Sequence, residues 1–259
     1  MPERRPPIHA QASIGFERAA DAYERGRPEY PAAAVEHLIK SLDFARGRHV
    51  VELGAGTGKF TRTLVPTGVE ILAVEPVEAM RRKLSELVPG VKVVDGTAEA
   101  IPLPDASTDV VVVAQAFHWF DGEKALAEIH RVLKPGRGLG LVWNVRDDSL
   151  AWISKLTRII EPYEGDVPRY KSLAWMAAFR LTRLFSPPVR AEFAHLQKLS
   201  PDAIEDRVLS ISFIAALPDS ERESVREHVR ELVRQELDAR NPAVIEFPYR
   251  THVYTGRRL

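Results

Sequence analysis

Cysteine is absent from this chain of 259 residues, which excludes disulfide bonds, thiolate metal sites and a cysteine nucleophile. A net charge is also absent, because 36 acidic residues balance 36 basic residues. Without a net positive field the chain is a poor match for nucleic acid or an anionic membrane, so we expect neither as a partner. No pair of histidines has a metal-ligand spacing, so we expect no metal.

Long apolar runs are missing as well. No stretch of about 18 apolar residues occurs, and the segment Met1 to Ala10 has no apolar stretch that resembles a signal peptide. We therefore expect a cytoplasmic protein. The 45% of hydrophobic residues are enough for a substantial core, and the length fits one large α/β domain with a lid.

Three closely spaced glycines form the most informative stretch of the chain. Residues 50–53 have strand character, Gly54, Gly56 and Gly58 follow, and helical periodicity begins at Phe60. A phosphate-binding P-loop would need glycine where Leu53 stands, and serine or threonine where Phe60 stands.

A dinucleotide-binding fingerprint would need its third glycine at Lys59, which weakens that interpretation. Glu52 lies two residues before Gly54, at the end of the predicted strand. A carboxylate beside an open backbone suits a cationic ligand better than a pyrophosphate.

The segment Val51 to Gly58 resembles the first motif of class I S-adenosylmethionine (SAM) dependent methyltransferases. SAM carries a sulfonium and an ammonium group, which an acidic, glycine-rich turn can accommodate. The resemblance implies SAM as cofactor, S-adenosylhomocysteine as product, and contacts from Glu52, Gly54, Ala55 and Gly56.

The alternation of strands and helices predicts the fold. Strands are expected at 50–53, 69–74, 91–94, 109–114 and 138–143, with helices between them, and further strands at 189–199 and 245–254. We expect an α/β fold: a doubly wound, mostly parallel seven-stranded sheet with helices on both faces, the Rossmann-like methyltransferase fold, with a helical lid. The expected units are 1–46 (N-terminal helices over the cofactor), 47–146 (SAM-binding core) and 147–259 (lid insertions and the last two strands).

Further cofactor contacts are expected where strands end. Glu75 ends the second strand, where nucleotide-binding folds place an acidic residue against the ribose hydroxyls, and Pro76 follows it. Met80 can cover the adenine or belong to the core. Thr97 stands where the resembling family commonly has aspartate, so the backbone at Ala98 and Glu99 is expected to share in adenine recognition.

The fourth strand leads into a run of aromatic and polar residues. Gln115 is expected at the cofactor, and Phe117, His118 and Trp119 at the acceptor, together with Asn144 after the fifth strand. His118 is the histidine that this interpretation places near the crevice, as a general base or as part of a wall. The lack of an Asn/Asp-Pro-Pro-aromatic tetrad at Gln115 to His118 argues against methylation of nucleobases.

The N-terminal segment and the lid complete the hypothesis. Phe16, Ala20, Tyr23, Arg27 and Tyr30 are similar to the N-terminal segment of the group that includes trans-aconitate methyltransferase, where this segment folds over the cofactor. Tyr23 and Arg27 are therefore cofactor candidates and Tyr30 an acceptor candidate; the alternative is a helix on the sheet edge with Arg27 in solvent. The helix at 201–216, with Arg207, Ser212 and Phe213, is expected to reach over the sheet.

The function that follows is transfer of a methyl group from SAM to a small-molecule acceptor at oxygen. Two alternatives stay open at this point: an NAD(P)-dependent oxidoreductase and a non-catalytic SAM-binding regulator. The sequence identifies neither the acceptor nor the oligomeric state.

Overall fold

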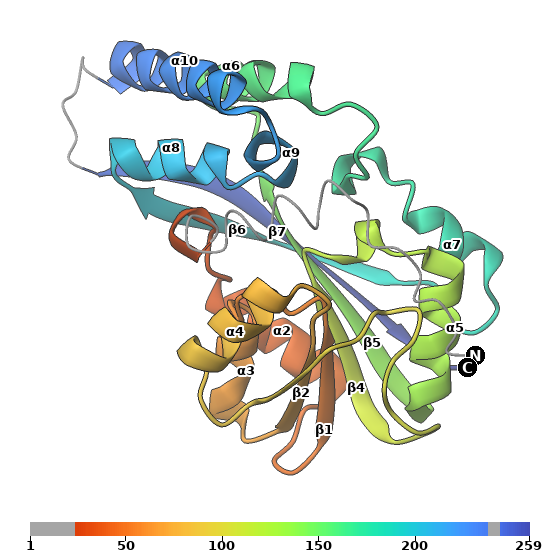
Figure 1. Cartoon of the computed structure of the whole chain (residues 1–259). Coiled ribbons are helices and arrows are strands. Elements are labelled where there is room, and N and C mark those ends of the chain that lie inside the picture. Colours follow the sequence, from red (N-terminus) through yellow and green to blue (C-terminus); the bar gives the residue numbers. More distant parts are fainter. Residues whose placement is uncertain (1–23, 238–243) are drawn as a thin grey trace.

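A seven-stranded mixed sheet organises the residues that the computed structural model describes, 24–237 and 244–259 (Figure 1). The strands lie in the order β3-β2-β1-β4-β5-β7-β6. Strands β1 to β5 pair in parallel, whereas β7 is antiparallel to both β5 and β6. Their bounds are β1 His49–Leu53, β2 Glu70–Val74, β3 Lys92–Val94, β4 Thr108–Ala114, β5 Leu133–Arg146, β6 Val189–Leu199 and β7 Ile245–Arg257.

Central strand β4 shows why this sequence forms a sheet interior. All seven of its residues are buried, and four consecutive valines supply the β-branched side chains that pack on both of its faces. The strand order reverses between β1 and β4. Connections diverge at such a point and leave a ligand crevice beyond the carboxyl ends of the strands.

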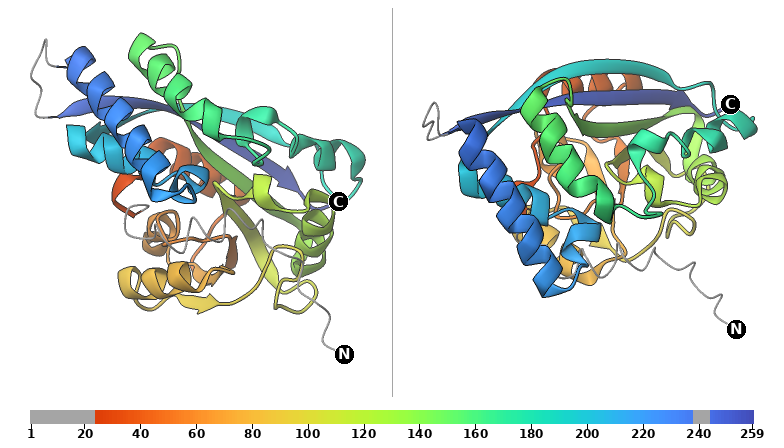
Figure 2. Two further views of the ribbon diagram at one scale, coloured as in Figure 1. Left: turned by 45° about the horizontal axis from the view of Figure 1, so that its top comes forward. Right: turned by 90° about the horizontal axis from the view of Figure 1, so that it is seen from above.

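Helices cover both faces of the sheet, as predicted (Figure 2). Helices α2 (Ala32–Leu42), α3 (Thr61–Leu64) and α4 (Glu78–Leu87) pack on one face, and α5 (Gly122–Val132) and α7 (Met176–Leu181) pack on the other. Helix α2 approaches β5 closely: a Cβ on Gly140 would lie 2.5 Å from Leu38 Cδ1, so any larger residue there would require the Leu38 side chain to move.

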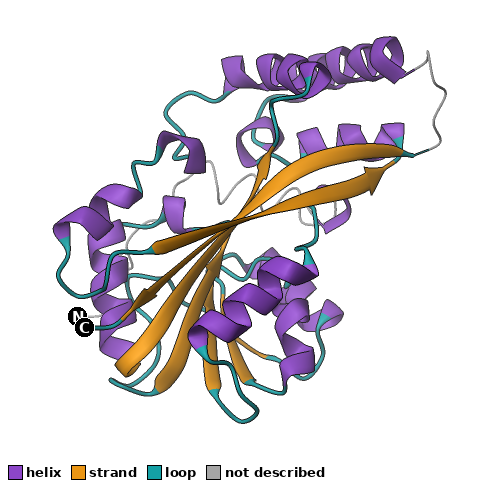
Figure 3. Ribbon diagram, turned by 180° about the vertical axis from the view of Figure 1, so that it is seen from behind, coloured by secondary structure: helices purple, strands orange, loops and turns teal. Residues whose placement is uncertain are grey.

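A second apolar cluster lies beyond the carboxyl edge of β5. It joins Ile245, Phe247 and Tyr249 of β7 to helices α6 (Ala151–Ile160), α8 (Pro201–Leu209), α9 (Ser212–Ala215) and α10 (Asp219–Leu237). Figure 3 shows the long strands β6 and β7 reaching from the main sheet into this group of helices. Within the described ranges, no helix combines the length and apolar character that crossing a membrane requires.

Several predicted elements differ from the structure. No helix joins β3 to β4 in the segment 95–107, where Pro102 and Pro104 oppose helix formation, so the expected alternation is incomplete. The continuous helix expected from Pro201 to Ala216 is divided, because Ile211 is extended between α8 and α9. Strand β5 is longer than 138–143, since β7 pairs with it from Gly138 to Arg146.

The strand assignments otherwise hold. The last two strands were expected at 189–199 and 245–254, and β6 and β7 occupy those segments, with β7 extending to Arg257. The division of the chain into units at residues 46 and 146 stays a prediction.

Candidate functional site

The glycine loop between β1 and α3 leaves its backbone open at one position. Gly54 and Gly56 have φ angles of +66° and +58°, in the left-handed region that favours glycine. A Cβ on Gly54 would lie 2.7 Å from the Cβ of Ala116, so packing already requires glycine there. A Cβ on Gly56 would meet no atom of the described residues within 4 Å, so a ligand can approach the main chain at this residue.

Glu75 directly follows β2 and lies against this loop. The carboxyl ends of β1, β2 and β3 are in register, which brings Gly54 and Glu75 to the same edge of the sheet. The Glu75 side chain is buried, and its oxygens accept hydrogen bonds from the backbone N–H of Gly56 (2.8 Å) and Val77 (2.9 Å). Burial raises the pKa of Glu75, against these two hydrogen bonds and the positive charge of Arg81. Each oxygen keeps a lone pair that can accept a ligand hydroxyl.

Thr97 offers a second polar atom to a ligand. Its hydroxyl oxygen is buried and has no hydrogen-bond partner in the described part of the chain. Ala98 beside it is buried, and the Glu99 carboxylate accepts the backbone N–H of Asp121 at 2.9 Å. A buried hydroxyl without a partner costs free energy unless a ligand satisfies it. Together with Gly56 and Glu75, Thr97 fits the adenosine part of SAM.

Four other predicted cofactor residues have partners within the protein. Glu52 is buried on β1, and its carboxyl accepts a hydrogen bond from the Thr61 hydroxyl at 2.7 Å. Burial raises the pKa of Glu52 to about 8, and the nearby Glu75 adds to the rise. Ala55 packs in a small apolar cluster with α4, and Met80 is fully buried. Pro76 accepts a hydrogen bond on its carbonyl oxygen from Arg81 at 2.7 Å.

Residues 24–31 lie across the glycine loop and are held there by charge. Lys59 is 8% exposed and pairs with Glu29 (2.8 Å) and Glu24 (3.4 Å). Glu24 also accepts hydrogen bonds from Thr57 (2.5 Å) and Arg62 (2.8 Å). We call this segment the N-terminal strap. Tyr23 lies outside the described residues.

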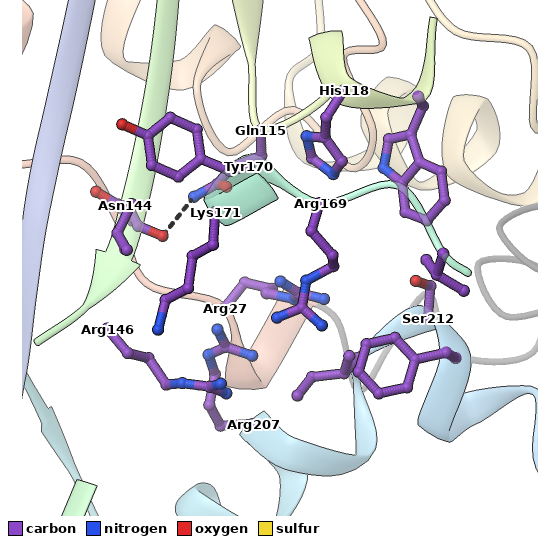
Figure 4. A pocket seen from close by; sticks show the side chains of 15 residues that line it. Arg27, Gln115, His118, Asn144, Arg146, Arg169, Tyr170, Lys171, Arg207 and Ser212 are labelled. Carbon is purple, nitrogen blue, oxygen red and sulfur yellow. Dashed lines mark hydrogen bonds between the residues drawn. The ribbon is translucent and has the colours of Figure 1, made fainter. Parts of the chain in front are cut away.

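A cationic pocket opens beside this edge, beyond the ends of β4 and β5 (Figure 4). Its volume is about 120 Å³. Among the residues that the structure describes, the lining has no carboxylate and five cationic side chains: Arg27, Arg146, Arg169, Lys171 and Arg207. The other residues around it are Gln115, His118, Trp119, Asn144, Val145, Val167, Tyr170, Ile211, Ser212 and Phe213.

Gln115 and Asn144 connect the two strand ends that form the pocket floor. Gln115 has a φ of +60°, which is unusual for a residue with a side chain, and its Nε2 donates to the Asn144 carbonyl at 3.2 Å. The Asn144 side chain donates to the Glu29 carbonyl (3.1 Å) and accepts from the Thr251 hydroxyl (2.6 Å). Asn144 therefore ties the strap to β5 and β7 as well as bordering the pocket.

His118 borders the pocket in a defined hydrogen-bonding state. Its Nδ1 lies 3.2 Å from the indole Nε1 of Trp143, which can only donate. Nδ1 must therefore accept, and in the neutral ring the proton belongs to Nε2. Burial lowers the pKa of His118 to about 3, and the charges of Arg169 and Arg27 add to this effect.

The structure brings some predicted acceptor residues to this pocket and not others. His118, Trp119 and Asn144 border it, whereas Phe117 is fully buried in the main core. The ring of Tyr30 packs on Phe60, with ring centroids 4.8 Å apart, and borders a different surface hollow beside α2. Tyr30 and Phe117 thus do not reach the pocket. Arg207, Ser212 and Phe213 do line it, and Arg27 donates to the Ser210 carbonyl at 3.0 Å.

Sequence reasoning missed Arg146, Arg169 and Lys171. Arg146 is the last residue of β5, and the position of this strand end was a usable indication. Arg146 was not recognised as a strand-end residue because the strand was predicted to end at residue 143. Arg169 and Lys171 belong to the irregular segment between α6 and α7, which carries no periodic pattern.

Comparisons with known proteins agree with this geometry. Residues 51–139 match the family model described as a methyltransferase domain. An uncharacterized methyltransferase of Mycobacterium tuberculosis is 39% identical over 92% of this chain and 93% of its own length. An uncharacterized methyltransferase-like protein of Schizosaccharomyces pombe is 37% identical over 91% of this chain and 92% of its own. The structure of a putative type II methyltransferase from Anaeromyxobacter dehalogenans shares the fold, with a TM-score of 0.60, 24% identity and coverage of 89% of this chain and 96% of that one.

Proposed function

Because this chain belongs to the methyltransferase family and uses SAM as its cofactor, we propose that it methylates a carboxylate oxygen of a small acceptor. The observation that carries this proposal is the pocket beside the glycine loop, to which the described residues contribute five cationic side chains and no carboxylate. Such a lining favours an anionic acceptor. The volume of about 120 Å³ favours a compact molecule rather than a nucleic acid.

The cofactor contacts in this proposal come from the sheet edge. Glu75 accepts the ribose hydroxyls, Thr97 hydrogen-bonds the adenine amine, and the backbone at Gly56 lies against the ligand. When bound, SAM supplies an electrophilic methyl group attached to a sulfonium. The chain itself contributes orientation and exclusion of water, and holding reactants in line can lower a barrier by roughly 7–11 kcal/mol in the best cases.

The protonation state of His118 supports a carboxylate acceptor over a hydroxyl. A hydroxyl acceptor needs a base to remove its proton, and a group with a pKa of about 3 is a poor base at neutral pH. A carboxylate is already ionised at that pH. In this proposal the Nε2–H of His118 donates a hydrogen bond to the acceptor and orients it.

The lid is formed in this proposal by α8, α9 and the segment around Arg169, with Arg27 of the strap on another side. Arg27 and Ser210 are already hydrogen-bonded across this arrangement. Lid and strap together exclude water from the pocket.

The two alternative functions are not retained. An oxidoreductase and a non-catalytic regulator both disagree with relatives that are methyltransferases along nearly their whole length. The ion-paired Lys59 also occupies the position where a dinucleotide fingerprint has its third glycine. The resemblance to the group that includes trans-aconitate methyltransferase stays a prediction.

Methyl release distinguishes the acceptor classes. The full chain is incubated with methyl-labelled SAM and separate panels of small carboxylic acids, phenols and amines. We expect a labelled product only from acids, and mild alkali should release it as methanol, because methyl esters hydrolyse under these conditions. Alkali-stable products from phenols or amines alone would contradict the proposal.

A further inference from the structure

The cationic side chains of the pocket divide into two groups. Figure 4 shows His118 on one side of the pocket and the guanidinium groups of Arg146 and Arg207 together on the opposite side, with Arg169 between them. We propose that the acceptor carries a second acidic group besides the one that is methylated, and that Arg146 and Arg207 bind this second group. This inference rests on the proposed function, because it assigns the acceptor of the same site.

Arg207 is a buried cation for which the described residues supply no counterion. Its residue is 6% exposed, its Nε donates to the Tyr249 hydroxyl at 2.9 Å, and its Nη1 is buried without a hydrogen-bond partner among the described residues. No carboxylate of the described ranges lies within ion-pairing distance of it. A buried charge that is satisfied only by a neutral hydroxyl is costly, and an anionic ligand would remove that cost.

Arg146 adds a second positive charge at the same place. Burial and the charge of Arg207 lower the pKa of Arg146 to about 10, which leaves it protonated at neutral pH. It too has no carboxylate within ion-pairing distance among the described residues. Two neighbouring guanidinium groups repel one another, and the fork of each matches a carboxylate or phosphate.

Several arginines elsewhere in the fold have acidic partners. Arg131 pairs with Asp105 and Glu128, both at 2.8 Å, and Arg250 pairs with Asp147 (3.1 Å) and Glu192 (2.9 Å). At the pocket itself, Arg169 lies 3.0 Å from Glu164, and Lys171 pairs with Asp148. Arg146 and Arg207 therefore differ from these two neighbours in having no acidic partner in the described part of the chain, and a ligand with a remote acidic group would supply one.

The test compares matched acceptors. Short aliphatic dicarboxylic acids, the monocarboxylic acids of the same chain length, and phosphorylated monocarboxylic acids are each assayed with the full chain and SAM. We expect dicarboxylic acids to have a kcat/KM at least about a hundredfold above that of the monocarboxylic acids, as expected for a buried charged contact. Phosphorylated acids as the better substrates would identify the second group as a phosphate. Equal use of mono- and dicarboxylic acids would overturn the proposal.

Variants locate the second site. Arg207→Gln and Arg146→Gln should each lower kcat/KM for dicarboxylic acids by about a hundredfold and leave monocarboxylic acids nearly unchanged. Arg207→Lys should recover part of the loss, because it restores the charge without the fork. Arg230→Gln is the matched control. Arg230 is exposed on α10 and pairs with Glu205 of α8, the helix that also carries Arg207. An equal loss for both classes of acid would show that these arginines have only a structural role.

Calorimetry separates this inference from the proposed function. If no acid is methylated and another class is, the carboxylate assignment is wrong. Binding of the acids to the complex of the protein with S-adenosylhomocysteine still tests whether Arg146 and Arg207 bind a second acidic group. Dicarboxylic acids that bind more tightly than monocarboxylic acids, with the difference lost in Arg207→Gln, would support this inference. Equal binding of the two classes of acid would contradict it. Unchanged S-adenosylhomocysteine affinity in each variant shows that the fold is intact.

Discussion

At the scale of single residues, the Trp143 indole determines which nitrogen of His118 carries the proton. A protonated ring would bring a second N–H against the indole N–H, so the neutral form is favoured by this contact as well as by burial. His118 would become charged only below about pH 3, where its lowered pKa lies.

This state predicts the pH dependence of the enzyme. The profile of kcat/KM should show no ascending limb near the ordinary imidazole pKa of about 6.5. His118→Asn should lower kcat/KM by about tenfold at most, the effect of one neutral hydrogen bond. An ascending limb near 6.5 that disappears in His118→Asn, with a loss of about 10²–10⁴-fold, would instead identify His118 as a general base.

Glu75 should contribute to cofactor affinity through its charge. Glu75→Ala is expected to weaken SAM binding by about 1.5–3 kcal/mol, the range for hydrogen bonds to a charged group. Because Glu75 also accepts two backbone N–H groups, Glu75→Gln, which retains the shape, separates the charge from the loop support.

Isothermal titration with SAM measures both variants. Glu78→Ala is the control, because its exposed side chain lies at the start of the next helix. Unchanged affinity in Glu75→Ala would remove Glu75 from the cofactor site.

Which residues could be predicted depended on the local pattern. Glu75 and Thr97 follow strands β2 and β3, whose mainly apolar side chains made the strands recognisable. The surroundings of Arg207, where the described residues supply no counterion, are set by how α8, β5 and β7 pack together. A local sequence pattern does not report such packing.

At the scale of elements, the strap is attached to the glycine loop by a cluster of charges that is only partly in solvent. In Glu24, burial raises the pKa, but the Thr57 hydrogen bond and the charges of Lys59 and Arg62 outweigh it, so the pKa is lowered. Glu24 is therefore ionised at neutral pH, and its contacts weaken as the pH falls below its ordinary value.

Lys59→Met should loosen the strap and weaken SAM binding. We expect a loss of about 1 kcal/mol, a modest value because Glu29 is mostly exposed and solvent screens the pair. Arg82→Met, which removes an exposed ion pair to Glu78 on α4, should leave the affinity unchanged. Titration at low and high salt measures the difference, and equal affinities for the two variants would show that the strap does not help to retain the cofactor.

Elements with strong periodicity were predicted well, and irregular ones were not. Strand β6 has the predicted bounds, and β4 begins one residue before its expected start. In the irregular segment 169–184, Leu173 adopts a left-handed φ of +54° and ends the short helical turn Tyr170–Ser172. A leucine gives no local indication of that conformation; packing of Trp175 against Phe117 and Trp143 accompanies it.

At the scale of the whole molecule, the buried Glu52 should make stability depend on pH. Its pKa is about 8 in the folded protein and near 4.5 in the unfolded chain, so folding takes up a proton between these values. Its contribution is fully present below about pH 4.5 and is lost as the pH rises toward 8, with a slope of up to about 1.4 kcal/mol per pH unit.

Glu52→Gln should remove this slope. The free energy of unfolding of the variant, relative to the natural chain, should increase steadily between pH 5 and pH 8 in urea titrations. Glu86→Gln, an exposed substitution at the end of α4, should show no such trend. Parallel curves for Glu52→Gln and the natural chain would mean that Glu52 is ionised in the folded state.

The separation of the two halves of the site along the chain has a consequence for how such enzymes diversify. The proposed cofactor contacts outside the strap come from β1 to β4 and their loops, whereas most of the cationic pocket residues come from the end of β5 and from the segments that flank β6. Replacement of those later segments can therefore alter the acceptor while the cofactor edge stays intact. Related enzymes can thus acquire new substrates by changes in these segments while the SAM-binding part of the fold is conserved. A chimera that carries these segments from a relative should methylate that relative's acceptor.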